Sequence, residues 1–198
     1  PNFVCIEQYN YNGSINAIKK SIAPNGEKIL IHISNFRKVK RTEDVIKIFN
    51  IVRQKIPAKL LMVGDGPERH RLEELCRELN TCHLIKFLGK VKDTERVLSA
   101  SDLFILPSET ESFGLAALEA MAAKTPVIST NTGGIPEVNK NGISGFLSNI
   151  GNVDEMANNA IKILSSDDIL NQFKTAAYEE AKKFDIHTIL PKYELLYK

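Results

Sequence analysis

Short apolar runs alternate along the chain with segments whose hydrophobic residues recur every three or four positions. The apolar runs predict strands at 28–34, 58–63, 83–88, 102–106 and 126–129, with a short sixth strand at 145–147. The segments with helical spacing predict helices at 42–55, around 72–79, at 93–100, 113–123 and throughout 153–197. Strands that alternate with helices form right-handed βαβ units. The sequence therefore predicts an α/β fold with a Rossmann-like parallel sheet flanked by helices.

The pattern also divides the chain into three parts. Residues 1–27 are polar and irregular, with several Asn, Gly and Pro residues, and are interpreted as an entry linker. Residues 28–183 contain the whole strand and helix alternation and form one Rossmann-like domain. Residues 184–198 are predicted to be a terminal helix. Because the chain opens at Pro1, we interpret it as a piece of a longer protein.

Composition excludes several classes of function. The 26 basic and 24 acidic residues give a net charge of +2, too balanced to indicate a nucleic-acid or membrane partner. No apolar run approaches the roughly 20 residues of a membrane span. The three cysteines are odd in number and lack a CxxC pair, so we expect buried free thiols in a reducing cytoplasm. The four histidines lack metal-ligand spacing, and His32 is interpreted as a satisfied core residue.

Ligands of open parallel sheets bind beyond the carboxyl ends of the strands. The loops that follow the predicted strands are therefore the candidates for function. Each of them carries Gly, Pro or charge that a simple connection does not require; they span 35–41, 64–67, 89–92, 107–112 and 130–136.

The segment 108–121 is the richest of these. It leaves a strand and is predicted to enter a helix near Ser112, so the amides of Phe113, Gly114 and Leu115 are expected to hold a diphosphate. Gly114 lets a ligand approach the backbone without a Cβ in the way. Glu111 precedes the helix and Glu119 lies two turns further on. Either glutamate taken alone also fits a surface charge.

The basic loop 34–41 offers cations for a diphosphate. Two cations and a helix N-terminus together can neutralise such a group without a metal ion. Lys40 is the first choice for this role and Arg37 the second. Lys38 and Arg41 are interpreted as part of the solvated face.

Glu111 and Glu119 are separated by seven residues, and Ser-Phe-Gly-Leu follows the first of them directly. This string resembles the E-x7-E signature of the retaining GT-B glycosyltransferases of family 4 type. The resemblance implies that Glu111 contacts hydroxyls of the donor sugar and Glu119 the ribose. It implies that Lys40 holds the family's lysine position, whereas Asn35 stands where the family usually has its arginine.

The other loops occur in the order that this family has. The resemblance implies that Gly64 and Gly66 form its glycine-rich loop and that Lys90 and Val91 belong to the loop that reads the base. A dinucleotide-binding fingerprint is the competing interpretation of the first loop, but Arg69 occupies the place of its third glycine.

Within the family, the chain resembles the N-acetylglucosaminyl malate synthases of bacillithiol biosynthesis. The resemblance implies UDP-N-acetylglucosamine as donor, L-malate as an acceptor held mainly by an absent N-terminal domain, and no cofactor or metal. It implies that this donor-binding half is inactive alone, and that the terminal helix packs towards the absent domain. Two alternatives stay open: a related polysaccharide or glycolipid transferase, and a stand-alone, non-catalytic sugar-nucleotide-binding module. The oligomeric state also stays open, with a homo-oligomer as one alternative.

Overall fold

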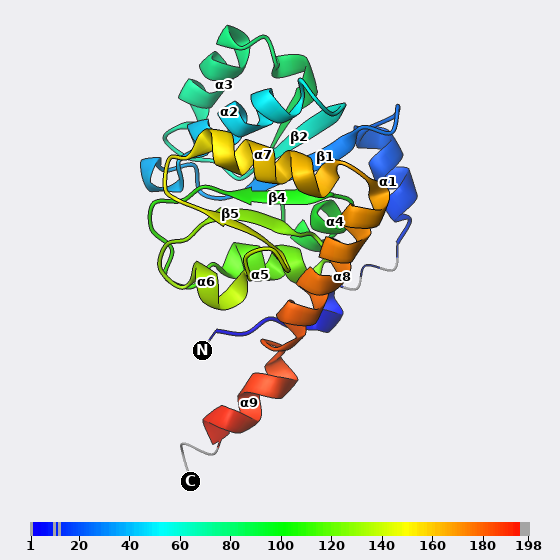
Figure 1. The fold of residues 1–198 in the computed structure, drawn as a ribbon, viewed down its shortest axis with the longest axis vertical. Helices are drawn as coiled ribbons and strands as arrows, with labels where there is room; N and C mark the ends of the chain where they lie inside the picture. The colour runs from blue at the N-terminus through cyan, green and yellow to red at the C-terminus, as the bar shows by residue number, and fades with distance from the viewer. Residues whose placement is uncertain (1, 10, 12, 195–198) are drawn as a thin grey trace.

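The computed structural model describes residues 2–9, 11 and 13–194. Its centre is a six-stranded sheet in the order β3-β2-β1-β4-β5-β6, in which every neighbouring pair is parallel. This order reverses direction between β1 and β4, as in doubly wound nucleotide-binding folds. The predicted fold class is confirmed (Figure 1).

All six predicted strands are present. They span Lys28–Ile33 (β1), Ala58–Val63 (β2), Ile85–Gly89 (β3), Leu103–Leu106 (β4), Val127–Thr130 (β5) and Gly145–Ser148 (β6). The residues of β4 and β5 are all buried, because helices cover both faces of the sheet. The third strand begins two residues later than predicted, after a 3-10 turn at Cys82–Leu84 (η3).

Helices pack in two layers (Figure 1). One layer, α2 (Thr42–Val52), α3 (Arg69–Glu78) and α7 (Val153–Leu164), shares a hydrophobic core with residues such as Leu30, Leu60 and Ile105. The other layer packs on the opposite face of the strands, against residues such as Ile31 and Phe104. It consists of α4 (Thr94–Ser99), α5 (Leu115–Ala122), the short α6 (Ile135–Val138) and α8 (Asp167–Lys182).

The N-terminal segment is more ordered than the linker interpretation of residues 1–27 predicted. It contains a 3-10 turn at Ile6–Tyr9 (η1) and an eight-residue helix at Ile15–Ile22 (α1), whose first turn is capped by the Ser14 hydroxyl. Val4 exchanges backbone hydrogen bonds with Phe184 and Ile186, next to the start of α9 (Ile186–Glu194). The N-terminal segment therefore lies against the junction of α8 and α9, and α9 extends away from the body of the domain (Figure 1).

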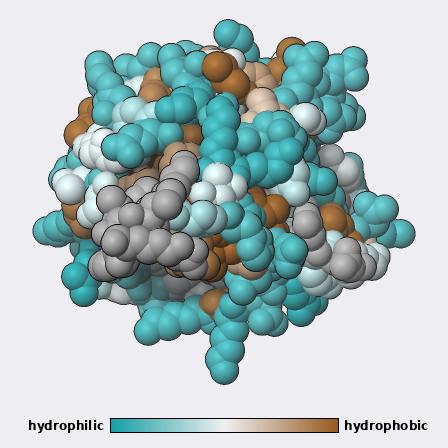
Figure 2. All heavy atoms as spheres, turned by 90° about the horizontal axis from the view of Figure 1, so that it is seen from below, coloured by the Kyte–Doolittle hydropathy of each residue, from teal (hydrophilic) through white to brown (hydrophobic). Residues whose placement is uncertain are grey.

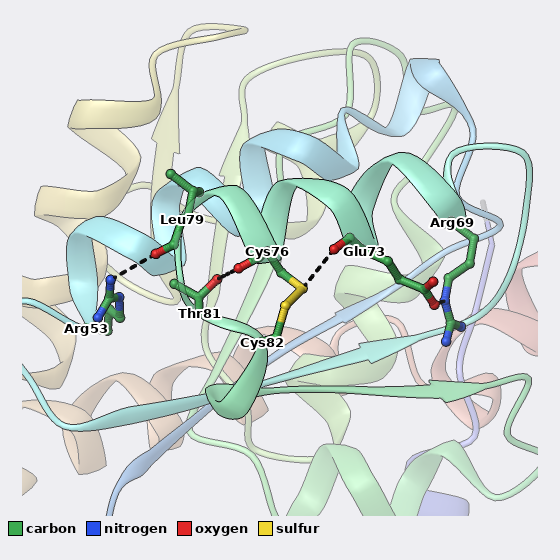
Figure 3. The surroundings of a disulfide bond; sticks show 7 residues. All are labelled: Arg53, Arg69, Glu73, Cys76, Leu79, Thr81 and Cys82. Atoms are coloured by element: carbon green, nitrogen blue, oxygen red, sulfur yellow. Dashed lines mark hydrogen bonds and ion pairs between the residues drawn. A yellow bond between two sulfur atoms is a disulfide. The ribbon is translucent and has the colours of Figure 1, made fainter.

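The prediction of three free thiols is wrong for two of them. A disulfide joins Cys76, in α3, to Cys82, in η3, and leaves Cys5 free (Figure 3). Between them, Asn80 adopts a left-handed conformation that ends the helix and turns the chain back. Both the amide and the hydroxyl of Thr81 donate to the Cys76 carbonyl oxygen, which fixes this turn.

The surface is mainly hydrophilic. Seen from the end at which α9 lies, hydrophobic residues form separate patches among polar ones (Figure 2). Large apolar side chains that are exposed include Phe3, Leu115 and Leu190. Within the part of the chain that the structure describes, no helix has the length and apolar character needed to cross a membrane.

Candidate donor site

The loops at the carboxyl edge of the sheet are packed against one another through their backbones. A Cβ on Gly64 would collide with the carbonyl oxygen of Ser34, and one on Gly66 with that of Asn35. Gly64 also has a φ of +118°, which strongly disfavours other residues. The loop after β2 therefore lies directly on the loop after β1, and its glycines serve this close approach.

The loop after β5 contacts the 108–112 segment in the same way. A Cβ on Gly133 would collide with the carbonyl oxygen of Glu111, and Gly134 donates its amide to that oxygen over 3.2 Å. The Thr132 hydroxyl donates to the carbonyl oxygen of Glu109 over 2.9 Å. The 108–112 segment is thus held from one side by the Gly133–Gly134 turn.

The basic loop holds this segment from the other side. The Glu109 amide donates to the Val39 carbonyl oxygen over 2.8 Å, and the Arg41 guanidinium donates to the Glu109 carboxylate over 2.9 Å. Arg41 also binds Asp44 over 2.6 Å, and its side chain is only 29% exposed. The assignment of Arg41 to the solvated face is therefore wrong, because it joins two loops.

Lys40 and Glu111 meet at the centre of this arrangement. The Lys40 ammonium donates to Glu111 Oε1 over 2.5 Å, and the Ser108 hydroxyl donates to the same oxygen over 3.0 Å. The two side chains are 23% and 13% exposed, so water screens the pair only in part. Neither bond uses Glu111 Oε2, and an ammonium carries three donors. The pair thus keeps one acceptor and two donors for a ligand.

Beneath this pair, His32 supports the basic loop from the core. His32 is fully buried; Nδ1 lies 2.8 Å from the Ile105 carbonyl oxygen and Nε2 lies 2.8 Å from the Ser34 hydroxyl. A carbonyl oxygen only accepts, so Nδ1 must carry the proton and Nε2 must accept from Ser34. The Ser34 oxygen in turn accepts from the Phe36 amide over 3.3 Å. Burial, together with the nearby Lys40 ammonium, lowers the pKa of His32 to about 4.

The turn held in this way is conformationally restricted. Phe36 is fully buried with a φ of +37°, an uncommon value for a residue with a side chain. Its carbonyl oxygen accepts from the Glu68 amide over 3.0 Å. The consequence is that Asn35 and Arg37, on either side of the anchored Phe36, are exposed at the edge of the sheet.

The helix that should receive a diphosphate begins later than predicted. Gly114, at a φ of +87°, is the N-cap residue of α5, and no side chain caps this helix. The first helical amides are therefore those of Leu115, Ala116 and Ala117 rather than those of Phe113, Gly114 and Leu115. The predicted role of Gly114 changes with it, since this glycine supplies the left-handed residue at which α5 begins. Ser112 and Leu115 are exposed beside this helix end.

Glu119 lies further along α5 and is only partly exposed. Burial raises its pKa, and the nearby Tyr9 hydroxyl partly offsets the rise. Burial and this carboxylate also raise the pKa of Tyr9. Tyr9 comes from η1, in the segment interpreted as a linker, so no pattern near Glu119 could have indicated this contact.

The remaining residues predicted for the site make fewer contacts. Lys90 is exposed after Gly89, which adopts a φ of +65°, and Val91 packs partly against the core next to it. Among the described residues no carboxylate pairs with Arg37, so the structure joins only one of the two predicted cations, Lys40, to the site. No group of His, Cys, Asp and Glu side chains within the described ranges is arranged to hold a metal.

Comparison with known sequences shows which family the chain belongs to. Residues 14–180 match the family model described as glycosyl transferases group 1. The chain belongs to the group 1 glycosyltransferases. The resemblance carried by Glu111, Glu119 and their flanking residues is thereby confirmed at the level of the family.

Several named glycosyltransferases resemble the chain across most of its length. It is 40% identical over 193 residues to the N-acetyl-alpha-D-glucosaminyl L-malate synthase of Bacillus anthracis, covering 96% of this chain and 51% of that protein. It is 30% identical to the 2-deoxystreptamine N-acetyl-D-glucosaminyltransferase of Niallia circulans, covering 87% of this chain and 45% of that one. The chain thus spans about half the length of these curated relatives.

Solved glycosyltransferases share the fold of this group 1 domain. HepE of Anabaena, in complex with UDP and glucose, superposes with a TM-score of 0.89 at 25% identity, over 100% of this chain and 55% of that one. Sucrose-phosphate synthase of Thermosynechococcus elongatus superposes with a TM-score of 0.88 at 25% identity, over 100% and 51% of the two chains.

Proposed function

We propose that this chain is the donor-binding half of a retaining GT-B enzyme that transfers N-acetylglucosamine from UDP to L-malate. The observation that carries the proposal is the Lys40–Glu111–Ser108 cluster beside the uncapped start of α5. The 40% identity to the malate synthase of Bacillus anthracis supports the choice of sugar and acceptor.

In this proposal the chain stabilises the departing diphosphate. The two remaining donors of Lys40 and the first amides of α5 bind the phosphate oxygens, and Arg37 swings in from the solvent as a second cation. Charge-assisted hydrogen bonds contribute about 1.5–3 kcal/mol each. Glu111, whose charge Lys40 balances, accepts from a sugar hydroxyl through Oε2 without repelling the phosphates.

The nucleoside is bound on the other side of α5. Glu119 accepts from the ribose hydroxyls. To do so it either turns away from Tyr9 or contacts Tyr9 and the ribose together. Lys90 and Val91 flank the base, while Asn35 and Ser112 lie at the rim. No metal is needed, because fixed cations and helix amides stabilise the charge of the diphosphate in its place. The malate site lies mainly in a domain outside this chain, so the chain alone transfers nothing.

Calorimetry on the chain and activity assays on the longer protein test the proposal. The chain should bind UDP and UDP-N-acetylglucosamine and prefer the latter to UDP-glucose. The longer protein should glycosylate L-malate with retention, and EDTA should not reduce the rate. Strict metal dependence would contradict the cationic mechanism. Transfer to a polysaccharide or lipid instead of malate would favour a related transferase, and binding without any transfer would favour a non-catalytic module.

A further inference from the structure

A second polar hollow lies at the opposite edge of the sheet, where the parallel strands begin. Its volume is about 890 Å³, and its walls include Lys19 of α1, Lys174 of α8 and Lys124, which follows α5. Ser14 and Ser99 add hydroxyl groups to the same wall. We call this feature the lysine hollow. Because α5 runs from the donor edge towards this edge, the lysine hollow lies at the end of that helix away from Glu111, although Tyr9, which lines the hollow, also lies near Glu119.

The charges around the lysine hollow are unbalanced. None of the residues that line it is acidic. Two of its lysines share the carboxylate of Asp102, whose Oδ1 accepts from Lys19 over 3.0 Å and from Lys174 over 2.8 Å. Its Oδ2 accepts from the Ile29 amide over 3.0 Å. One carboxylate therefore serves two ammonium groups and one amide, while Lys124 is exposed, with its ammonium 5.1 Å from the centre of the Tyr178 ring.

Burial makes this imbalance costly. The Asp102 side chain is 7% exposed and that of Lys174 is 21% exposed. Burial lowers the pKa of Lys174, because the surroundings hydrate its ammonium poorly, although Asp102 partly restores it. A single lysine would suffice to neutralise Asp102. Because Lys19 and Lys174 share that carboxylate, an anion that enters the hollow would supply a second counter-charge to the poorly hydrated Lys174.

We propose that the lysine hollow is a binding site for a small phosphate monoester. Lys19, Lys124 and Lys174 present ammonium groups on one wall, and the first and last of them share the single carboxylate of Asp102, which favours the dianion of a phosphate monoester near neutral pH. Lysine ammonium groups bind phosphate as point charges, and the Ser14 hydroxyl, which accepts from Ala17, still has its own proton to donate. The hollow is larger than a phosphate ion and falls within the size range of small-molecule sites, so it has room for an organic group.

Calorimetric titration tests this site independently of the donor site. The chain is titrated with glycerol 3-phosphate, inorganic phosphate and glycerol at constant ionic strength, with and without saturating UDP. We expect one glycerol 3-phosphate per chain in both conditions, weaker binding of phosphate, and none of glycerol. Lys124→Gln removes a lysine outside the Asp102 cluster and should weaken binding at least fivefold without changing the melting temperature. Lys162→Gln, on the exposed face of α7, removes the same charge elsewhere and should change nothing.

Amide chemical shifts then locate the ligand. The proposal requires the largest changes at Ser14 and Ala123, at the lysine hollow, and small ones at Gly114, at the start of α5. Changes centred on Gly114, equal losses in the two lysine variants, or no saturable binding would each overturn it. Binding of inorganic phosphate as tight as that of the ester would overturn the assignment of an ester.

Discussion

Protonation of His32 should make the basic loop of the donor site acid-labile. In the folded chain burial lowers the pKa of His32 to about 4, whereas in the unfolded chain it returns to 6.5. The unfolded state therefore binds more protons between these values. The stability contributed by neutral His32 is fully present above pH 6.5 and is lost as the pH falls towards 4. At about 1.36 kcal/mol per pH unit, the loss amounts to about 3 kcal/mol.

The loss should have a local consequence as well. A protonated imidazole carries a proton on Nε2 and can no longer accept from the Ser34 hydroxyl, whose oxygen anchors the Phe36 amide. The turn that presents Lys40 should therefore loosen before the sheet unfolds. UDP affinity should decline only as the pH approaches 4, where His32 of the folded protein itself takes up a proton.

Urea unfolding at half-unit steps from pH 7.5 to pH 4 measures the effect. His32→Gln is the matched variant, because an amide can donate to Ile105 and accept from Ser34 without titrating. The wild type should lose about 3 kcal/mol more than His32→Gln over this interval. Parallel pH profiles for the two proteins, or an NMR spectrum that shows His32 charged at pH 6, would refute the reasoning.

The remaining predictions concern the ribose, the disulfide and the loop glycines. Glu119→Ala should weaken UDP and uridine alike, at least tenfold, since both carry the ribose; calorimetry that finds unchanged affinity for both would remove Glu119 from the site. Reduction of the Cys76–Cys82 disulfide opens a short loop, with a sequence separation of 6, and should lower stability by about 2 kcal/mol and the melting temperature by roughly 5 °C. Cys5→Ser should keep this sensitivity to reductant, and Cys82→Ser should abolish it. Gly64→Ala should cost at least about 3 kcal/mol in denaturant unfolding, because its Cβ meets the Ser34 backbone, whereas Gly26→Ala, in open space at a φ of +78°, should cost about 1 kcal/mol.

The central sheet could be predicted because its strands are buried on both faces and therefore appear as continuous apolar runs. The boundaries of the helices were harder to predict from the sequence. The start of α5 depends on Gly114 adopting a left-handed conformation, which moves the first helical amide from Phe113 to Leu115. Helix α1 was missed although Ser14 is a typical N-cap residue and Ile15, Ile18 and Ile22 have helical spacing. That signal was present but was outweighed by the Asn, Gly and Pro residues on either side.

The part of the site that depends only on the order of strands and loops along the chain could be predicted. Lys40 and Glu111 both follow central strands, so the topology brings them to the same edge, where they form an ion pair. The partners Tyr9 and Cys82 could not be found in this way. Tyr9 reaches Glu119 only because the N-terminal segment folds back over α4 and α5, and the disulfide depends on the turn at Asn80. Both contacts arise from tertiary structure and leave no periodic signal.

The donor-edge loops touch through main-chain atoms, at Gly64 against Ser34 and at Gly133 against Glu111. The Arg41–Glu109 and Lys40–Glu111 pairs add side-chain contacts between the same loops, whereas the exposed side chains of Asn35, Arg37 and Ser112 take part in neither pair. A substitution at one of these three positions should therefore leave the scaffold in place. Its glycines, by contrast, are the positions at which a single methyl group would displace a whole loop.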